Sequence, residues 1–580
     1  MVNPEFAPTT AQAITRGLRL TISKKALAAL SLVTLLGIFL RFWGIGWGLP
    51  DARHPLATYH PDELVDFSAL QQSDIVHGKL DIGFYNYGTL CFYLADLAQT
   101  VGHGYGAIPS TTAPPADAAP AGHMETAQRQ LAETRGIYLA ARVTTALMGC
   151  ITIPVLFALG RRLFGVRCGL VAAALYAILP LAVVHAHFFT VDVGATLFVT
   201  LALLASAKLL DTPTWQKAIT AGIWCGLAAA CKYSVVMVFA APVIALLSGK
   251  PSEPRKLPIL PIAALAAGAL VGFLVACPGP LLNWNSFWNG LPNYPESGVR
   301  YELLVHPRAG HGLLFVNTGP GWWYHLVVSL RFGLGVPGLL LVLAGIVAMA
   351  LMRTRQDRLV LGYLLIAYGI TGLSGVRFAR YMIPLYPAMC IGVARLLAPD
   401  FISRFRAMRA ALPAVLGLCA ALTLTYTASL VHAMAGQDPR DAAADAIEHA
   451  AAQGATVAFA KTPWYFSPPL SQWFGEMSAP ARRKSTQSER YKFVLPADGT
   501  EFDAGVFNPV PDFFVISNIE TINERRLHIP IALNFLKAIP TNMQPKKYAP
   551  PAIFDMAFSG AYIPDDLAYI LPEITVYTRK

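Results

Sequence analysis

Two adjacent carboxylates follow a proline in the stretch Tyr59-His60-Pro61-Asp62-Glu63. Acidic residues in the first turn of a helix complement its dipole, so Asp62 and Glu63 fit a helix cap. Aspartate and glutamate are also the usual general bases of enzymes that deprotonate a hydroxyl group. The pair alone leaves both interpretations open.

A second acidic residue, Asp192, ends the stretch His185-Ala-His-Phe-Phe-Thr-Val-Asp192, which joins two apolar segments. His185, His187 and Asp192 have the side-chain types that bind a divalent metal. The alternative is that the histidines bond to backbone groups near the membrane surface. Because His-x-His spacing is weak evidence by itself, a metal remains an alternative and no cofactor is required.

Lys232 has about fifteen mostly apolar residues on each side. An ammonium group at the edge of hydrocarbon costs several kcal/mol unless it is paired or hydrated, so a functional role is the default expectation.

In the topology described below, three arginines lie at the outer side of the membrane, where basic residues are not expected. They are Arg142, Arg377 and Arg380, and Tyr381 follows the last of them. A guanidinium group matches the oxygens of a phosphate, which predicts a phosphate site near the lipid headgroups. The alternative is that these side chains extend toward ordinary lipid phosphates.

The composition identifies the environment of these residues. Of 580 residues, 55% are hydrophobic and 14% are charged, against roughly 25% charged in soluble domains. The chain is therefore predicted to be a polytopic membrane protein. Its net charge of +11 is expected from basic loops on the cytoplasmic side, and it does not indicate nucleic-acid binding.

Eleven apolar segments are predicted to cross the membrane. They lie at about 26–49, 137–160, 168–184, 192–209, 217–231, 233–248, 258–277, 326–352, 359–375, 380–397 and 411–433. Every basic loop falls on the cytoplasmic side only if 217–248 forms two segments rather than one bent helix. The N-terminus is then cytoplasmic, and Asp62, Asp192, Lys232, Arg377 and Arg380 share the outer face.

The predicted fold class is a mainly α polytopic membrane protein with a small C-terminal α/β domain. Residues 1–433 form the transmembrane domain, with outer loops at 50–136 and 278–325, and the first of these loops carries amphipathic helices. Residues 434–580 lack long apolar runs and are expected to form a periplasmic domain. Within it we expect a helix at 441–452 and strands at 456–460, 512–517 and 574–578.

An ordered set of short motifs resembles the C-type (GT-C) membrane glycosyltransferases, closest to the bacterial branch related to protein O-mannosyltransferases and to the lipid A aminoarabinose transferase. The motifs are Pro61-Asp62-Glu63, Ala141-Arg142-Val-Thr-Thr-Ala-Leu, Gly160-Arg-Arg-Leu-Phe-Gly165, Leu179-Pro180 leading to His187-Phe-Phe-Thr-Val-Asp192, Ala230-Cys-Lys232-Tyr233 and Arg380-Tyr381-Met-Ile-Pro384. They span roughly residues 35 to 400 in the family's order.

This resemblance implies that Asp62 is the general base, that Glu63 supports it and that Asp192 is the family's second acidic position. It places Lys232 and the 377–381 segment where the donor phosphate is bound. The expected reaction is inverting transfer of a sugar from a polyprenyl-monophosphate donor to an acceptor hydroxyl of lipid A, protein or another glycan. The expected location is the outer face of the bacterial inner membrane.

Two other functions remain open. One is a transporter or flippase for a lipid-linked or anionic substrate, with Lys232 and the arginines along its path. The other is a glycan polymerase or ligase that uses diphosphate-linked donors.

Overall fold

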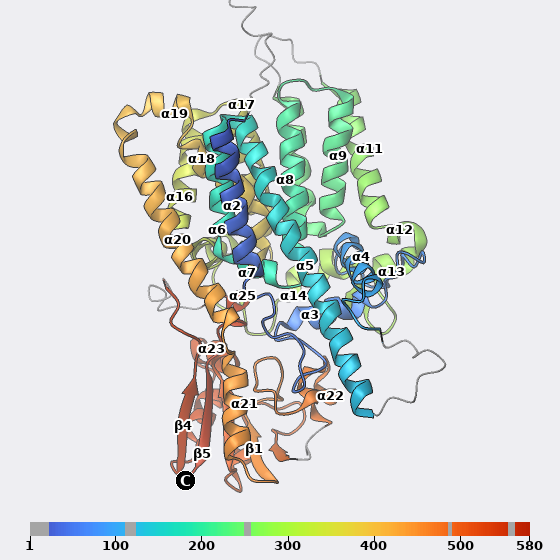
Figure 1. The fold of residues 1–580 in the computed structure, drawn as a ribbon, viewed down its shortest axis with the longest axis vertical. Coiled ribbons are helices and arrows are strands. Elements are labelled where there is room, and N and C mark those ends of the chain that lie inside the picture. Colours follow the sequence, from blue (N-terminus) through green and yellow to red (C-terminus); the bar gives the residue numbers. More distant parts are fainter. Residues whose placement is uncertain (1–21, 111–122, 249–256, 485–489, 555–562) are drawn as a thin grey trace, which may run out of the picture.

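The computed structural model describes residues 22–110, 123–248, 257–484, 490–554 and 563–580. The predicted cytoplasmic residues before 22 lie outside these ranges. A helical bundle forms one end of the molecule and a small α/β domain forms the other, with the outer loops between them (Figure 1). Helix α2 begins at the end of the bundle that is farthest from the C-terminal domain.

Each of the eleven predicted apolar segments contains a helix. The bundle consists of α2 (Lys24–Phe42), α5 (His123–Phe164), α6 (Val166–Ile178), α7 (Pro180–Val184), α8 (Val191–Leu209), α9 (Trp215–Ala229), α10 (Ala240–Leu247), α11 (Ile259–Ala276), α16 (Leu330–Met352), α17 (Arg355–Thr371), α18 (Tyr386–Arg395) and α20 (Ala411–Ala435). Within the described residues, seven helices are long and apolar enough to cross a membrane, or eight if the bent pair α6 and α7 is one span. The other three predicted segments form shorter helices.

The segment 217–248 forms a hairpin and not one helix. At one end, Lys232 follows α9 and bonds to Asp192 at the start of α8, with Nζ 2.7 Å from Oδ1. At the other end, Arg355 donates hydrogen bonds to the carbonyl oxygens of both Ser248 (2.7 Å) and Leu210. Since Leu210 follows α8, residue 248 has returned to the end of the bundle from which α9 started.

Close packing of α9 on α11 depends on glycine. Gly222 and Gly226 face α11, while Gly268 and Gly272 face α9, and the two helices run side by side in Figure 1. A Cβ atom at Gly226 would lie 2.1 Å from the carbonyl oxygen of Ala269. Small residues four apart allow two membrane helices to approach this closely.

Replacing Gly226 by valine is therefore expected to push α9 away from α11 and to destabilise the protein by about 1–3 kcal/mol. The midpoint of thermal unfolding in detergent measures the effect. Gly417→Val on α20 is the matched control, because a Cβ atom there would meet no atom within 4 Å in the described structure. Equal midpoints for the two variants would contradict the packing argument.

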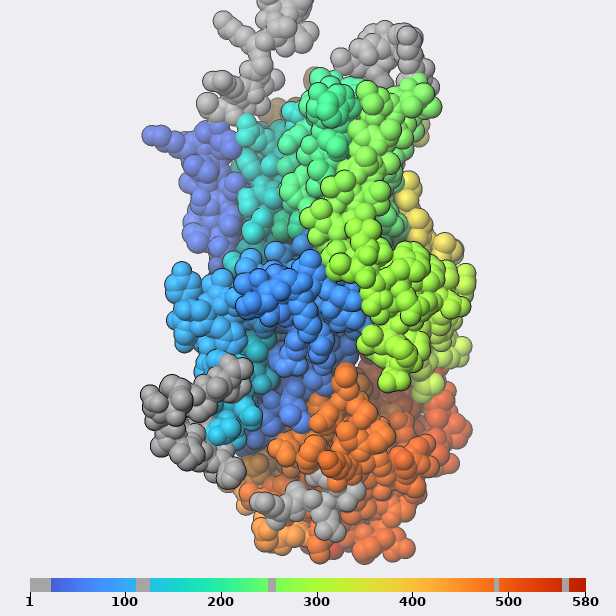
Figure 2. Space-filling model, turned by 90° about the vertical axis from the view of Figure 1, so that its right-hand side faces the viewer, coloured from blue at the N-terminus to red at the C-terminus, as the bar shows by residue number. Residues whose placement is uncertain are grey.

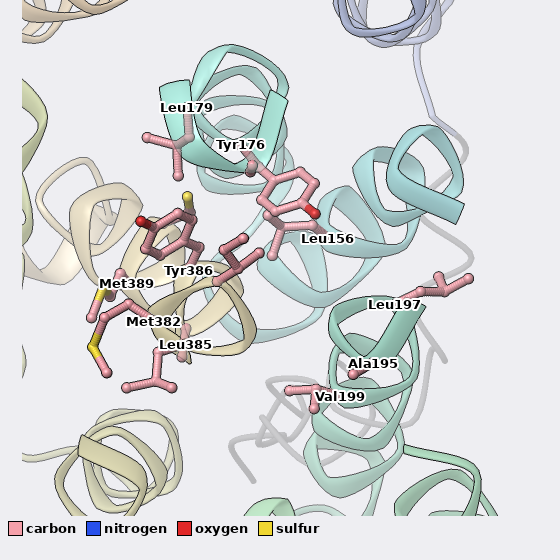
Figure 3. Packing of buried hydrophobic residues seen from close by; sticks show 14 of the residues in the cluster. Leu156, Tyr176, Leu179, Ala195, Leu197, Val199, Met382, Leu385, Tyr386 and Met389 are labelled. Carbon is pink, nitrogen blue, oxygen red and sulfur yellow. The ribbon is translucent and has the colours of Figure 1, made fainter. Parts of the chain in front are cut away.

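Apolar side chains from several helices fill the centre of the bundle. Figure 3 shows Tyr176 and Leu179 of the α6 region facing Tyr386 and Met389 of α18, with Leu156 of α5 beside them. This packing holds fixed the helix ends from which the polar residues of the outer face project.

The two outer loops pack against each other and contain short helices. The first carries α3 (Pro61–Leu70) and α4 (Leu90–Gly104), and the second carries α12 (Gly279–Leu282), α13 (Trp284–Asn289), α14 (His306–Ala309) and α15 (Gly321–Tyr324). The amide of Tyr85 donates a hydrogen bond to the carbonyl oxygen of Ser297, at 2.6 Å. Figure 2 shows both loops above the C-terminal domain.

A five-stranded mixed sheet organises the C-terminal domain, in the order β2-β1-β3-β5-β4. Its strands are β1 (Ala455–Phe459), β2 (Tyr491–Val494), β3 (Phe513–Ser517), β4 (Met543–Tyr548) and β5 (Ile574–Arg579). Strand β1 pairs in parallel with β2 and β3, while β5 pairs antiparallel with β3 and β4. The helices of this domain are α21 (Pro439–Ala450), α22 (Ala479–Arg483), α23 (Asn518–Arg526), α24 (Pro530–Lys537) and α25 (Asp565–Ala568). In the membrane domain, the short helix α19 (Pro399–Arg404) lies in the loop before α20.

Candidate active site

Helix α3 begins at the carboxylate pair. His60 is its N-cap, Pro61 is the first helical residue, and Asp62 and Glu63 lie in the first turn. The two side chains nevertheless reach different partners on distant parts of the chain. The cap alternative therefore accounts for their position along the helix but not for their contacts.

Glu63 is a fully buried link between α3 and two other elements. Its carboxylate accepts hydrogen bonds from Arg142 (2.8 and 2.6 Å), from the amide of Phe189 (2.8 Å) and from the hydroxyl of Thr58 (2.6 Å). Burial raises the pKa of Glu63, but the charge of Arg142 and these hydrogen bonds outweigh burial and hold the pKa below its ordinary value.

The position of Arg142 corrects the prediction that it binds a donor phosphate. Besides Glu63, its guanidinium donates hydrogen bonds to the carbonyl oxygens of Ile45 (2.8 Å) and Trp47 (2.7 Å). The side chain is fully buried and all three of its nitrogens are engaged. Arg142 therefore ties α5 to the end of α2 and to α3.

Asp62 faces the centre of the site. Its Oδ2 lies 2.8 Å from a terminal nitrogen of Arg380, and 33% of its side-chain surface is exposed. Partial removal from water raises the pKa of Asp62, but the charge of Arg380 outweighs this effect and keeps the pKa below its ordinary value. The carboxylate is therefore ionised at neutral pH.

Arg380 lies among three carboxylates. One terminal nitrogen forms the ion pair with Asp62, the other lies 2.7 Å from Oδ1 of Asp566, and Nε lies 3.9 Å from Oδ2 of Asp192. Asp566 belongs to α25 of the C-terminal domain and is absent from the residues predicted above. The sequence does carry a signal for it, since Pro564-Asp565-Asp566 repeats the order of a proline followed by two acidic residues.

Asp66 is a further buried acid that was not predicted from the sequence. It lies one turn after Asp62 on α3 and is 2% exposed. Burial raises the pKa of Asp66 well above its ordinary value, and the charge of Asp62 raises it further. The four-residue spacing from Asp62 along a helix was the available signal.

Lys232 and Asp192 form a buried ion pair of 2.7 Å. The Lys232 ammonium also lies 4.3 Å from the centre of the Tyr381 ring, a distance typical of a cation–π contact. The lysine is thus both paired and packed, as an ammonium group at this depth requires.

Lys232, Asp192 and Tyr381 line a cavity of about 530 Å³. Much of the remaining lining is apolar and comes from the segment after Lys232, the outer end of α17 and the segment just before α18, including Val235, Val236, Ala367, Ile370, Leu373 and Leu385. Glu302, His306 and Arg308 of the second outer loop also line the cavity. Charged side chains and an extensive apolar wall therefore border the same cavity.

Arg377 and His187 do not reach this centre. Arg377 donates hydrogen bonds of 2.6 Å to the hydroxyl of Thr318 and to the carbonyl oxygen of Gly319, so it holds the second outer loop. The ring nitrogens of His187 lie 2.9 Å from the carbonyl oxygen of Val183 and 3.0 Å from that of Trp43. This is the backbone-bonded alternative stated above.

His185 lies closer to the centre, with Nε2 3.7 Å from Oδ1 of Asp566. In the part of the chain that the structure describes, no group of three or more His, Cys, Asp or Glu side chains is arranged to hold a metal ion. The structure thus does not bring His185, His187 and Asp192 together as a ligand set.

A family model described as dolichyl-phosphate-mannose-protein mannosyltransferase matches residues 136–278. Four of the six motifs that carry the resemblance lie at or within this stretch, from Arg142 to Lys232, and the predicted resemblance is confirmed there. The matched segment is roughly a quarter of the chain and is similar in sequence to this glycosyltransferase family. No curated protein sequence matches the chain.

Several solved structures are similar to this chain at low sequence identity. One is ArnT from Cupriavidus metallidurans bound to undecaprenyl phosphate, with 12% identity, a TM-score of 0.45 and coverage of 95% of this chain and 97% of that chain. Another is the oligosaccharyltransferase AglB from Archaeoglobus fulgidus with an inhibitory peptide and a dolichol-phosphate (13% identity, TM-score 0.44, 89% and 72% coverage). The Saccharomyces cerevisiae Pmt1–Pmt2 complex bound to its sugar donor matches over 46% of this chain and 35% of that chain (14% identity, TM-score 0.32).

Proposed function

We propose that this chain is an inverting glycosyltransferase that moves a sugar from a polyprenyl-monophosphate donor to an acceptor hydroxyl. The observation that carries the proposal is the cavity in which the Lys232–Asp192 ion pair lies beside an extensive apolar wall. A polyprenyl phosphate has the same two parts, an anionic group and a long hydrocarbon chain. The matched family's description also names a sugar carried on a lipid monophosphate.

In this proposal the donor phosphate lies near the Lys232 ammonium and the Tyr381 ring, and the polyprenyl chain runs along Val236, Ile370 and Leu373. The latter three side chains are strongly exposed at the cavity wall. Apolar lining with a few converging polar groups is the usual composition of a ligand site.

The reaction needs a base and stabilisation of a leaving group. Asp62 removes the proton from the acceptor hydroxyl, and the acceptor oxygen forms a bond to the anomeric carbon as the bond from that carbon to the phosphate oxygen breaks. The electron pair leaves with the polyprenyl phosphate, whose added negative charge is stabilised by Lys232 and Arg380. A single displacement of this kind inverts the anomeric configuration, and no cofactor is required.

Arg380 connects the two halves of this reaction. Its ion pair with Asp62 keeps the base ionised in the absence of substrate, but it also weakens that base. A donor phosphate competes with Asp62 for the guanidinium, so donor binding would free Asp62 to accept a proton.

Replacing Lys232 by methionine is expected to weaken donor binding by about tenfold or more, because a charge-assisted contact contributes about 1.5–3 kcal/mol. Titration of the purified protein with a polyprenyl monophosphate measures the effect. Lys208→Met is the matched control, since Lys208 lies in the last turn of α8, at the opposite end from Asp192. Because Lys232→Met removes the 2.7 Å partner of Asp192, Lys232→Met/Asp192→Asn repeats the measurement without that carboxylate. Wild-type affinity there would remove Lys232 from the donor site.

We place the reaction at the outer face of the bacterial inner membrane, with the N-terminus cytoplasmic and the C-terminal domain periplasmic. The acceptor is lipid A, a protein or another glycan. Mass analysis of lipid A, surface glycans and envelope proteins from bacteria with and without the gene tests this proposal. Loss of one sugar from one of these classes is the expected result, and identical profiles would contradict it.

A further inference from the structure

The C-terminal domain reaches into the centre of the membrane domain's polar site through Asp566. Its Oδ1 lies 2.7 Å from a terminal nitrogen of Arg380. Its Oδ2 accepts hydrogen bonds from the backbone amides of Ala379 and Arg380, the latter at 3.3 Å. One carboxylate thus holds both the backbone and the side chain of Arg380.

Asp566 makes these contacts while it is completely buried. A buried carboxylate is costly unless it is paired and hydrogen-bonded, and here the partners are Arg380 and two amides, with His185 at 3.7 Å. Its neighbour Asp565 is also buried. Burial raises the pKa of Asp565 to about 7, and the charge of Asp566 adds to this increase.

The contacts of Arg380 are divided among its nitrogens. Asp566 holds one terminal nitrogen, Asp62 holds the other, and Nε points toward Asp192 at 3.9 Å. Without Asp566 the released nitrogen can turn toward Asp62, where a two-point guanidinium–carboxylate contact is the favoured geometry. That contact would occupy both oxygens of the proposed base.

We propose that Asp566 is a positioning residue for sugar transfer, contributed by the C-terminal domain, and that it fixes the Arg380 guanidinium between Asp62 and the donor phosphate. This inference rests on the proposed function. It gives the C-terminal domain a part in the chemistry in addition to any part in acceptor recognition. Donor affinity depends mainly on Lys232 and the apolar wall, so Asp566 acts on kcat more than on KM.

A double-mutant cycle tests this inference, with kcat and the donor KM measured for wild type, Asp566→Asn, Arg380→Gln and the double variant. We expect Asp566→Asn to lower kcat about tenfold with the donor KM within about threefold of wild type. If Asp566 acts through Arg380, the double variant has the kcat of Arg380→Gln to within about threefold, because residues that act as a unit are not additive. Additive losses would overturn the inference, as would a wild-type kcat for Asp566→Asn.

Two further variants separate positioning from folding. Asp565→Asn is the matched control, expected to keep wild-type kcat, and an equal loss of kcat there would overturn the inference.

Asp566→Glu keeps the charge and is expected to recover at least half of the kcat lost in Asp566→Asn. If Asp566→Asn does not fold, Asp566→Glu takes its place in the cycle, with the same non-additivity expected and additive losses again overturning the inference. Absence of transfer by the wild-type protein would instead reject the proposed function itself.

Discussion

Replacing Asp62 by asparagine is expected to lower kcat for sugar transfer by about 10²–10⁴-fold, the contribution typical of a general base. Asparagine has nearly the same shape but cannot accept the proton of the acceptor hydroxyl. Asp62 is one-third exposed, unlike the buried Glu63 beside it, so the variant is expected to fold. Initial rates with a polyprenyl-monophosphate sugar measure kcat. Binding of the same donor is expected to be kept or to become tighter, because Lys232 is unchanged and the residue at position 62 no longer competes for Arg380.

Asp74→Asn is the matched control for this prediction. Asp74 lies in the same outer loop, pairs with exposed His77 and takes no part in the site. It is expected to keep wild-type kcat. Full activity of Asp62→Asn would remove Asp62 from the role of base.

Replacing Arg142 by alanine is expected to unfold the outer side of the bundle rather than to weaken donor binding selectively. The change removes both bonds to Glu63 and both bonds to the carbonyl oxygens after α2, and it leaves the Glu63 carboxylate buried without its charge partner. Breaking a buried ion pair in this way costs about 3–5 kcal/mol. Thermal unfolding in detergent, followed by the amount of monodisperse protein that remains, measures the loss.

Arg135→Ala on the same helix is the control, because Arg135 is exposed and bonds only to the carbonyl oxygen of Pro50 among the contacts described. A normal unfolding midpoint for Arg142→Ala combined with weaker donor binding would restore the phosphate role predicted from the sequence.

The helices could be predicted because their signal is local. Each of the eleven apolar segments contains a helix, and seven or eight helices among the described residues are long and apolar enough to cross a membrane. The requirement that basic loops face the cytoplasm favoured two segments at 217–248, as the contacts of Arg355 show. Strands β2 and β4 were not predicted. Strand β4 has the sequence Met-Gln-Pro-Lys-Lys-Tyr, and a mostly polar strand with a proline is typical of a sheet edge that avoids further pairing.

The site could be predicted only in part. A charged residue beside an apolar segment can be recognised in the sequence because it is costly to bury, but the partner that it binds lies far away in the sequence. Lys232, Asp192, Arg380 and Asp62 were selected as charges at the outer face, and the structure brings these four together. Arg142 and Arg377 were selected on the same grounds, but backbone carbonyl groups and Glu63 take up their hydrogen bonds. No feature of the sequence near these arginines distinguishes the two outcomes.

Asp566 could not be predicted from the sequence as the partner of Arg380. It lies in a domain that reads as soluble, and only the packing of α25 against the segment Ala379–Leu385 brings it to Arg380. A buried acid in a small domain gives no local indication of the membrane helix that it contacts.

The most direct test of the central claim is sugar transfer by the purified protein from a polyprenyl-monophosphate donor. Envelope extract from bacteria that lack the gene supplies the acceptor, and Asp62→Asn is measured in parallel. We predict a glycosylated product with inverted anomeric configuration from the wild-type protein, and no detectable product from Asp62→Asn at equal donor occupancy. Retention of configuration, transfer only from diphosphate-linked donors, or equal transfer by the two proteins would contradict the account.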